Sequence, residues 1–299
     1  MKKAEFDEPI MIIAFNRPES TERVFREVRK IKPKDFFLAV DGPRNKEEEK
    51  KVQRVRDTIN EIDWECNVHT LFSDKNKGCL GGVSSAESWF FDNVGRGIIL
   101  EDDAVPSPDF FSFCAEMLEK YKNDERIMHI TGFNYKGSCE CEDSYYFSRY
   151  PYTYGFASWR RAWKKQDLKM SNYETFKKKR FFRSVFPSFL ERTYTKKIFD
   201  EAYSNDKVGP DTQWLFALAS NNGLTIVPKN NMIEYIGFGP ESTHTSSEDA
   251  FLGAPVSRME FPLKHPKIIV RDEEKDRQYI NWLVKNKIKK RIKRLLSFL

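Results

Sequence analysis

Three consecutive acidic residues, Glu101, Asp102 and Asp103, end an apolar run in the segment GIILEDDAVPSPDFF, residues 97–111. Two carboxylates ~4 Å apart repel each other by about 4 kcal/mol at the effective dielectric of a protein surface, so such a cluster needs water or a cation. Hard divalent cations bind substrate phosphates through one or two carboxylates and keep waters elsewhere. The triplet therefore favours a Mg²⁺ or Mn²⁺ site that carries a diphosphate, with a solvated strand end as the alternative.

The elements around the triplet alternate between strand and helix. Apolar runs predict strands at 10–15, 36–40, 67–73 and 97–100, and periodic segments predict helices at 20–31, 46–62, 83–94 and 109–121. Strand and helix units of this length predict an α/β fold with a mostly parallel sheet and helices on both faces. Ligands of such sheets gather beyond the carboxyl ends of the strands, where Asp41, the 74–78 loop and the triplet all fall.

The alternation stops after residue 130. A basic aromatic helical section at 172–203 precedes an apolar helix, which begins at Asp211, and a short hairpin-like pair of strands at 224–236. No repeat or low-complexity linker marks a boundary. We expect this half to fold over the sheet edge as an extension of the same domain and to carry the acceptor contacts.

Aromatic residues crowd one stretch of this second half. An aromatic platform can pack against the apolar face of a sugar ring, and core packing is the alternative. The residues are Tyr152, Tyr154, Phe156, Trp159 and Trp163.

Composition bounds the class of protein. The chain of 299 residues is 39% apolar, which is enough for a full globular core. Its five cysteines lack regular spacing, and Cys139 and Cys141 lack a second pair for zinc, so free thiols are expected. The start resembles no signal peptide and no run of about 20 apolar residues occurs, which predicts a cytoplasmic protein.

The positive charge is concentrated in the last 15 residues. The segment 285–299 holds seven Lys and Arg residues and no acid, while the whole chain carries +6, so the remainder carries −1. Nucleic-acid binding is therefore not expected. The apolar residues of this segment recur at helical spacing, which predicts a basic amphipathic helix over 271–299 that lies on the anionic inner face of the cell membrane. A helix bound to a partner protein and a solvated terminus are the alternatives.

The segment RGIILEDDAVPSPDFFSF resembles the metal-site segment of the GT-A glycosyltransferases. The match is closest to the eukaryotic N-acetylglucosaminyltransferase I group, in which an apolar strand, E-D-D and a P-D-F-F helix start occur in the same order. Bacterial family-2-like sugar transferases share the wider layout. The resemblance covers about 10–245 and includes YGFASWRRAW, PDTQW and GFGPESTHT in matching order. It implies a GT-A fold, which is Rossmann-like, but it identifies neither donor nor acceptor.

The resemblance also implies roles for the triplet. Asp103 would ligate the metal, Asp102 would lie near the ribose or the metal waters, and Glu101 would face the nucleotide. His244 in ESTHT would contact the metal or the diphosphate, with a structural histidine as the alternative.

Further residues would hold the donor, for which UDP is the expected nucleotide. The base and ribose would be held by Asp41, for which a turn role is the alternative, and by the loop of Ala14, Phe15, Asn16 and Arg17.

Three more residues complete the expected donor site. Arg44 and Lys77 are candidates for the diphosphate, with solvated loop charge as the alternative. Gly155 would let the backbone come near the donor sugar.

In the resembling group, an acid at the position of Asp211 is the general base that takes the proton of an acceptor hydroxyl. A helix cap also explains an Asp at this position. The expected reaction is inverting transfer of a sugar to a hydroxyl of a glycan or lipid-linked precursor. A metal-dependent sugar nucleotidyltransferase and a non-catalytic glycan- or lipid-binding protein are the alternatives.

The expected organisation has one catalytic domain and a terminal helix. The GT-A domain would cover 1–270, with a nucleotide-binding half at 1–130 and an acceptor-side half at 131–270. The basic helix would follow at 271–299.

Overall fold

The computed structural model describes residues 3–178, 180–205, 209–237 and 253–296. Its first half alternates strands and helices, as predicted. The elements are β1 (Ile10–Ala14), α1 (Pro18–Ile31), β2 (Asp35–Val40), α2 (Lys46–Arg56), a 3-10 helix (Asp57–Glu61), β3 (Asn67–Phe72), α3 (Gly78–Asn93) and β4 (Arg96–Glu101). The four strands are parallel in the order β3-β2-β1-β4.

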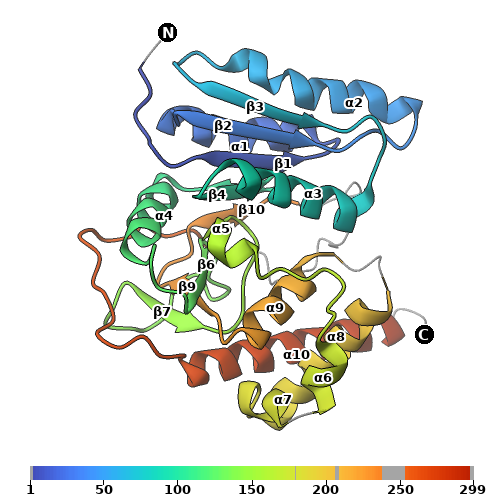
Figure 1. Cartoon of the computed structure of the whole chain (residues 1–299), viewed down its shortest axis with the longest axis vertical. Helices are drawn as coiled ribbons and strands as arrows, with labels where there is room; N and C mark the ends of the chain where they lie inside the picture. Colours follow the sequence, from blue (N-terminus) through green and yellow to red (C-terminus); the bar gives the residue numbers. More distant parts are fainter. Residues whose placement is uncertain (1–2, 179, 206–208, 238–252, 297–299) are drawn as a thin grey trace.

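The second half adds four strands to the same sheet. The elements are β5 (Ala104–Pro106), α4 (Pro108–Lys120), β6 (Ile127–Thr131), β7 (Tyr145–Ser148), β8 (Phe156–Trp159), α5 (Arg160–Trp163), α6 (Tyr173–Lys178), α7 (Phe181–Val185), α8 (Phe189–Ser204), α9 (Asp211–Ser220), β9 (Leu224–Pro228), β10 (Ile233–Tyr235) and α10 (Glu273–Leu296). The eight-stranded sheet has the order β3-β2-β1-β4-β8-β6-β9-β7, and β8 is antiparallel to both of its neighbours. The α/β class with a mostly parallel sheet is confirmed, and Figure 1 shows the helices packed around it.

Two expectations for the second half are wrong. The segment 224–236 is not a hairpin, because β9 pairs with β6 and β7 whereas β10 pairs with β5. Asn231 lies between the two strands. Its side chain accepts a hydrogen bond from the backbone N–H of Asn134 and donates one to the carbonyl of Ala254, which fixes this part of the chain. The half also continues the sheet through β8, where we expected it to fold over the edge.

Helix α3 begins at Gly78, five residues before the predicted start. The glycines of NKGCLGG predicted a loop, yet Gly81 and Gly82 lie within the helix. A Cβ on Gly82 would stand 3.1 Å from Asp41 Oδ2, so the missing side chain lets the helix approach the end of β2 closely.

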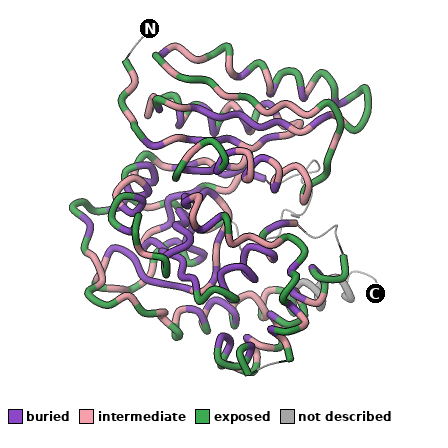
Figure 2. The backbone as a smooth tube through the Cα atoms, viewed as in Figure 1, coloured by how far each residue is buried: buried purple, intermediate pink, exposed green. Residues whose placement is uncertain are grey.

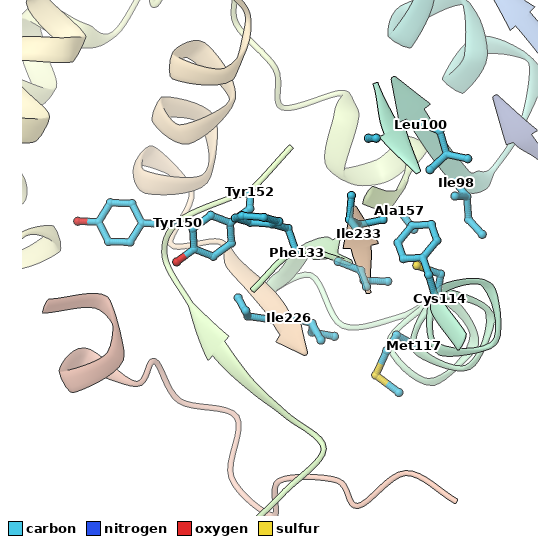
Figure 3. Close-up of a cluster of buried hydrophobic side chains, with 14 of the residues drawn as sticks. Ile98, Leu100, Cys114, Met117, Phe133, Tyr150, Tyr152, Ala157, Ile226 and Ile233 are labelled. Atoms are coloured by element: carbon cyan, nitrogen blue, oxygen red, sulfur yellow. The ribbon is translucent and has the colours of Figure 1, made fainter. Parts of the chain in front are cut away.

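Apolar side chains from both faces of the sheet form the core. Strands β1, β2 and β4 are buried along their length, and Figure 2 shows this burial running through the centre of the molecule. The same core continues from β4 through β8 and β9 and reaches α4, and Figure 3 shows Ile98, Ala157, Ile226, Cys114 and Met117 among its side chains.

The aromatic stretch 152–163 belongs mainly to this core. Tyr152, Phe156, Trp159 and Trp163 are buried, and the Trp163 ring stacks on Phe91 with a centroid distance of 5.7 Å. Core packing is therefore confirmed for these four residues, and the sugar platform is wrong for them.

The C-terminal helix α10 is tied to the domain by its first turns. Arg271 pairs with Glu191 and Asp276, and Asp276 also accepts hydrogen bonds from Ser148 Oγ and from the backbone N–H of Arg149, which is 3.1 Å away. The predicted helix is confirmed over 273–296. Among the described residues, no helix is long and apolar enough to cross a membrane.

Candidate functional site

The parallel register brings the polar ends of β1, β2 and β4 together. Ile13 pairs with Glu101, so the chain that follows β1 lies beside the chain that follows β4. The backbone N–H of Phe15 donates to Asp102 Oδ2 at 3.3 Å. The predicted loop after β1 and the acidic triplet therefore meet at the carboxyl edge of the sheet.

Arg17, which directly precedes α1, forms a clamp on two of the three acids. Its guanidinium donates to Asp102 through Nε at 3.3 Å and through Nη2, and to Asp103 Oδ2 through Nη1 at 2.7 Å. Burial disfavours the charge of Arg17, but Asp102 and Asp103 outweigh this effect and raise its pKa. The fold thus supplies a cation to the cluster from its own sequence.

The triplet remains electrostatically strained despite this clamp. Burial raises the pKa of Asp102 to about 6, because desolvation and Asp103 together exceed the opposing effect of Arg17. Burial also raises the pKa of Glu101 well above its usual range, and the charges of Asp103 and Asp211 raise it further. A cation bound beside these groups would lower both pKa values.

Two carboxylates from distant elements complete the acid cluster. Asp211 begins α9, and Glu87 lies on α3 with 6% of its surface exposed. Desolvation raises the pKa of Glu87 well above its usual range, and Asp211 adds to this shift. Glu101, Asp211 and Glu87 therefore lie close enough to influence one another's protonation.

Asp103 is the best candidate for a metal ligand among the described residues. Its Oδ1 is buried and has no hydrogen-bond partner there, while its Oδ2 is held by Arg17. A Cβ on Gly237 would stand 2.5 Å from Asp103 Oδ2, so glycine is needed where this chain passes the carboxylate. No three His, Cys, Asp or Glu residues among those described are arranged to hold a metal. His244 lies outside the described residues.

Both carboxylate oxygens of Asp41 accept hydrogen bonds from the backbone. Oδ1 accepts from the backbone N–H of Gly42 at 2.8 Å, and both oxygens accept from the backbone N–H of Lys77 at 3.0 Å. Asp41 thereby joins the end of β2 to the start of α3, which fits the turn role, and its contact with a nucleotide stays a prediction. The Lys77 side chain is exposed beside this junction.

Asn16 and Arg44 meet at a carboxylate that sequence reasoning missed. Glu48 accepts from Asn16 Nδ2 at 3.0 Å and from Arg44 Nε at 2.9 Å, and these bonds lower its pKa. The Arg44 guanidinium also lies 5.2 Å above the centre of the Phe15 ring. These contacts order the loop beside the triplet, and Ala14 is buried beneath it.

Gly155 is required by the fold itself. It has a φ of +68°, and a Cβ there would stand 2.7 Å from Ile233 Cδ1. Its backbone conformation and the packing of β10 therefore explain the glycine, and the approach of a donor sugar to this residue stays a prediction. Tyr154, the preceding residue, lies near the acid cluster, because Asp211 and Glu101 add to the effect of burial in raising its pKa.

A groove of about 740 Å³ runs along the first turns of α3. It is lined by Lys77, Gly78, Cys79, Leu80, Gly81, Ser84, Ser85, Ser88 and Leu168. Cys79 connects the groove to the acid cluster, since burial raises its pKa to about 11 and Asp211 contributes to the shift. Asp211 is thus near enough to influence Cys79, one of the residues that line the groove.

The sequence carries only weak signals for the two residues that sequence reasoning missed. Glu87 begins the stretch ESWFF on α3, and a charged residue on a buried helix face is unusual. Glu48 stands among three consecutive acids, and nothing in its spacing distinguishes it from Glu47 and Glu49.

Comparison with known proteins yields only distant likenesses. No protein-family description matches the chain, and no curated protein matches it. HddC from Yersinia pseudotuberculosis is 9% identical with a TM-score of 0.33, over 52% of this chain and 77% of that chain. A UDP-glucose pyrophosphorylase in complex with UDP-glucose is 9% identical with a TM-score of 0.38, over 75% of this chain and 92% of that chain. The 4-diphosphocytidyl-2C-methyl-D-erythritol synthase from Anaerococcus prevotii DSM 20548 is 12% identical with a TM-score of 0.32, over 71% and 98%. The resemblance to the GT-A enzymes stays a prediction.

Proposed function

We propose that the protein is a metal-dependent, inverting glycosyltransferase that moves a sugar from a nucleotide diphosphate donor to an acceptor hydroxyl. The observation that carries this proposal is the meeting of Asp211 with the acidic triplet across 110 residues of sequence. A single carboxylate opposite a donor site is what in-line displacement with a general base requires.

Asp103 Oδ1 would take the metal, and Mg²⁺ or Mn²⁺ bound there with the donor would supply charge stabilisation for the departing diphosphate. Arg17 holds the other oxygen of Asp103 and so fixes the direction in which Oδ1 points. Lys77, whose side chain is exposed at the start of α3, would approach the diphosphate.

The groove along α3 would receive the acceptor. Its serines can exchange hydrogen bonds with sugar hydroxyls, and Ser84 Oγ is buried there without a partner among the described residues. The acceptor hydroxyl would reach Asp211 at the end of this groove and pass its proton to the carboxylate as it attacks the donor sugar. The acceptor class we propose is a glycan or lipid-linked precursor.

The test begins with thermal unfolding in a panel of nucleoside diphosphates, with and without Mn²⁺. We expect one nucleotide class to stabilise the wild type in a metal-dependent manner. Asp103→Asn should weaken this binding at least about tenfold, whereas Asp211→Asn should bind normally. Glu65→Gln, which removes an exposed acid far from the cluster, is the matched control. Equal loss of binding in the Asp103 and Asp211 variants would reject these roles.

The reaction type is tested by its products. A glycosyltransferase releases nucleoside diphosphate from a nucleotide sugar, with water as a slow acceptor. A nucleotidyltransferase releases pyrophosphate from a nucleoside triphosphate and a sugar 1-phosphate. We expect only the first product, and Asp211→Asn should reduce it by about 100-fold or more. Pyrophosphate release would replace the proposal with the alternative reaction.

A further inference from the structure

Two cysteines face each other in the turn between β6 and β7. Cys139 Sγ and Cys141 Sγ are 3.2 Å apart, and both residues are partly exposed. A disulfide bond requires a separation of about 2.05 Å, so the sulfurs need to approach by only about 1.2 Å. We call these two residues the cysteine pair.

The turn that carries the cysteine pair is held by backbone hydrogen bonds. The N–H of Cys139 donates to the carbonyl of Lys229 at 3.0 Å, and the N–H of Asn231 donates to the carbonyl of Gly137 at 2.7 Å. The turn therefore holds the two sulfurs close together before they react. Such preorganisation favours bond formation between them over reaction with a second molecule.

The two thiols differ in acidity. The hydrogen bond from Cys141 lowers the pKa of Cys139 to about 7, with Lys275 and Lys136 contributing. The same contact raises the pKa of Cys141. At neutral pH Cys139 is therefore about half thiolate, and Cys141 is the more strongly protonated of the two.

We propose that the cysteine pair is a redox-active dithiol that exchanges with small-molecule disulfides such as glutathione disulfide. The Cys139 thiolate attacks one sulfur of the disulfide, which forms a mixed disulfide and releases one glutathione thiolate. Cys141 then loses its proton to that thiolate and attacks Cys139 Sγ, which expels the second glutathione as a thiolate that takes a proton from water. The pair loses two electrons and one glutathione disulfide is reduced to two thiols. The pair lies outside the acid cluster, so this inference does not depend on the proposed function.

The other cysteines provide an internal contrast. Burial raises the pKa of Cys66 to about 11, as it does for Cys79, and Cys114 is fully buried with a pKa raised well above its usual range. A low-pKa thiol is modified first when several compete. Cys139 should therefore react at least about ten times faster than Cys66 at neutral pH.

The experiment treats the reduced full-length protein with glutathione disulfide at pH 7.5, then quenches it with acid and alkylates the remaining thiols. Mass spectrometry of the peptide that contains the cysteine pair should show the loss of two hydrogens and no stable glutathione adduct. Cys141→Ser should instead accumulate a glutathione adduct on Cys139. Cys139→Ser should react no faster than Cys66, and Cys66→Ser should behave as the wild type.

Reversal by glutathione and the circular dichroism of each variant complete the test. Oxidised wild-type protein should return to two free thiols when excess reduced glutathione is added. The proposal fails if the pair in the wild type stays reduced while Cys66 is modified. It also fails if Cys139→Ser and Cys141→Ser accumulate adducts equally, because the two thiols would then act independently.

Discussion

Arg17 supplies at the residue scale the cation that the acidic triplet requires. Its guanidinium binds Asp102 and Asp103 from a loop 85 residues earlier in the chain. One positive charge cannot neutralise five neighbouring carboxylates, and the pKa of Asp102 stays raised at about 6. Arg17 thus neutralises part of the negative charge of the cluster when no donor is bound. A metal ion bound together with the donor would neutralise the rest.

The variant Arg17→Gln should be less stable than the wild type, by an amount that depends on pH. Without the guanidinium, Asp102 and Asp103 lose their only cation among the described residues, and the free energy of unfolding should fall by roughly 2–3 kcal/mol at pH 8. A carboxyl whose folded pKa is raised above its unfolded value loses stability as pH rises through that window. The deficit should therefore be smaller at pH 5, where Asp102 is protonated. Urea unfolding at both pH values measures the difference.

Divalent cations should partly rescue this variant. Mn²⁺ at millimolar concentration should raise the melting temperature of Arg17→Gln more than that of the wild type, because it replaces the missing charge. Arg23→Gln, which breaks an exposed ion pair with Glu234, is the matched control and should respond as the wild type does. Equal shifts in all three proteins would count against a cation site at Asp103.

The sequence identified the triplet, Asp211 and the loop after β1, because each of them ends or begins a strongly patterned element. It could not identify Glu87, since the approach of Glu87 to Asp211 depends on how the two halves of the chain fold together. Nor could it show why residue 155 must be glycine, because the side chain that a Cβ there would meet comes from Ile233, far away in sequence.

Most of the first half was predictable at the element scale. The parallel strands β1, β2 and β4 are mostly buried and read as short apolar runs, whereas the edge strand β3 is more exposed. All four were found within two residues of their predicted bounds. The second half was less predictable, because β7, β8 and β9 pair with strands that are not their sequence neighbours. Long-range pairing of this kind leaves no local signal.

Helix α3 packs on the sheet through a glycine of β4. A Cβ on Gly97 would stand 2.4 Å from Phe90 Cζ and 2.9 Å from the carbonyl oxygen of Pro9. Gly97→Ala should therefore lower the free energy of unfolding by roughly 1–3 kcal/mol, because Phe90 and the backbone must both shift. Gly95→Ala is the control, since nothing lies within 4 Å of its added Cβ, and it should change stability by less than about 1 kcal/mol. Urea unfolding of both variants measures this. Similar losses in the two would mean that helix–sheet contact does not set the requirement.

At the scale of the whole molecule, charge and structure divide the protein into two regions. The chain without 285–299 carries −1, while those 15 residues carry seven positive charges. The first turns of α10 are fixed by Arg271 and by the burial of Tyr279 and Ile280. Further along, Lys285, Ile288 and Lys289 are exposed. The lysines of α10 whose exposure the structure describes beyond residue 284, Lys285, Lys287 and Lys289, therefore face the surroundings.

We therefore predict that the basic part of α10 binds anionic lipid. Each basic residue near such a surface contributes about 1 kcal/mol, so Lys285→Gln with Lys289→Gln should weaken binding to phosphatidylserine vesicles by roughly 30-fold. The matched control is Lys46→Gln with Lys50→Gln, which removes two exposed lysines at the same spacing from α2, at the opposite end of the molecule in Figure 1. Cosedimentation with vesicles at low and at physiological salt measures both, and added salt should weaken the wild type most because it screens charge. Equal losses of vesicle binding in the two double variants would mean that total charge, and not the position of α10, governs binding. If the wild type does not sediment with the vesicles, the membrane is not a partner.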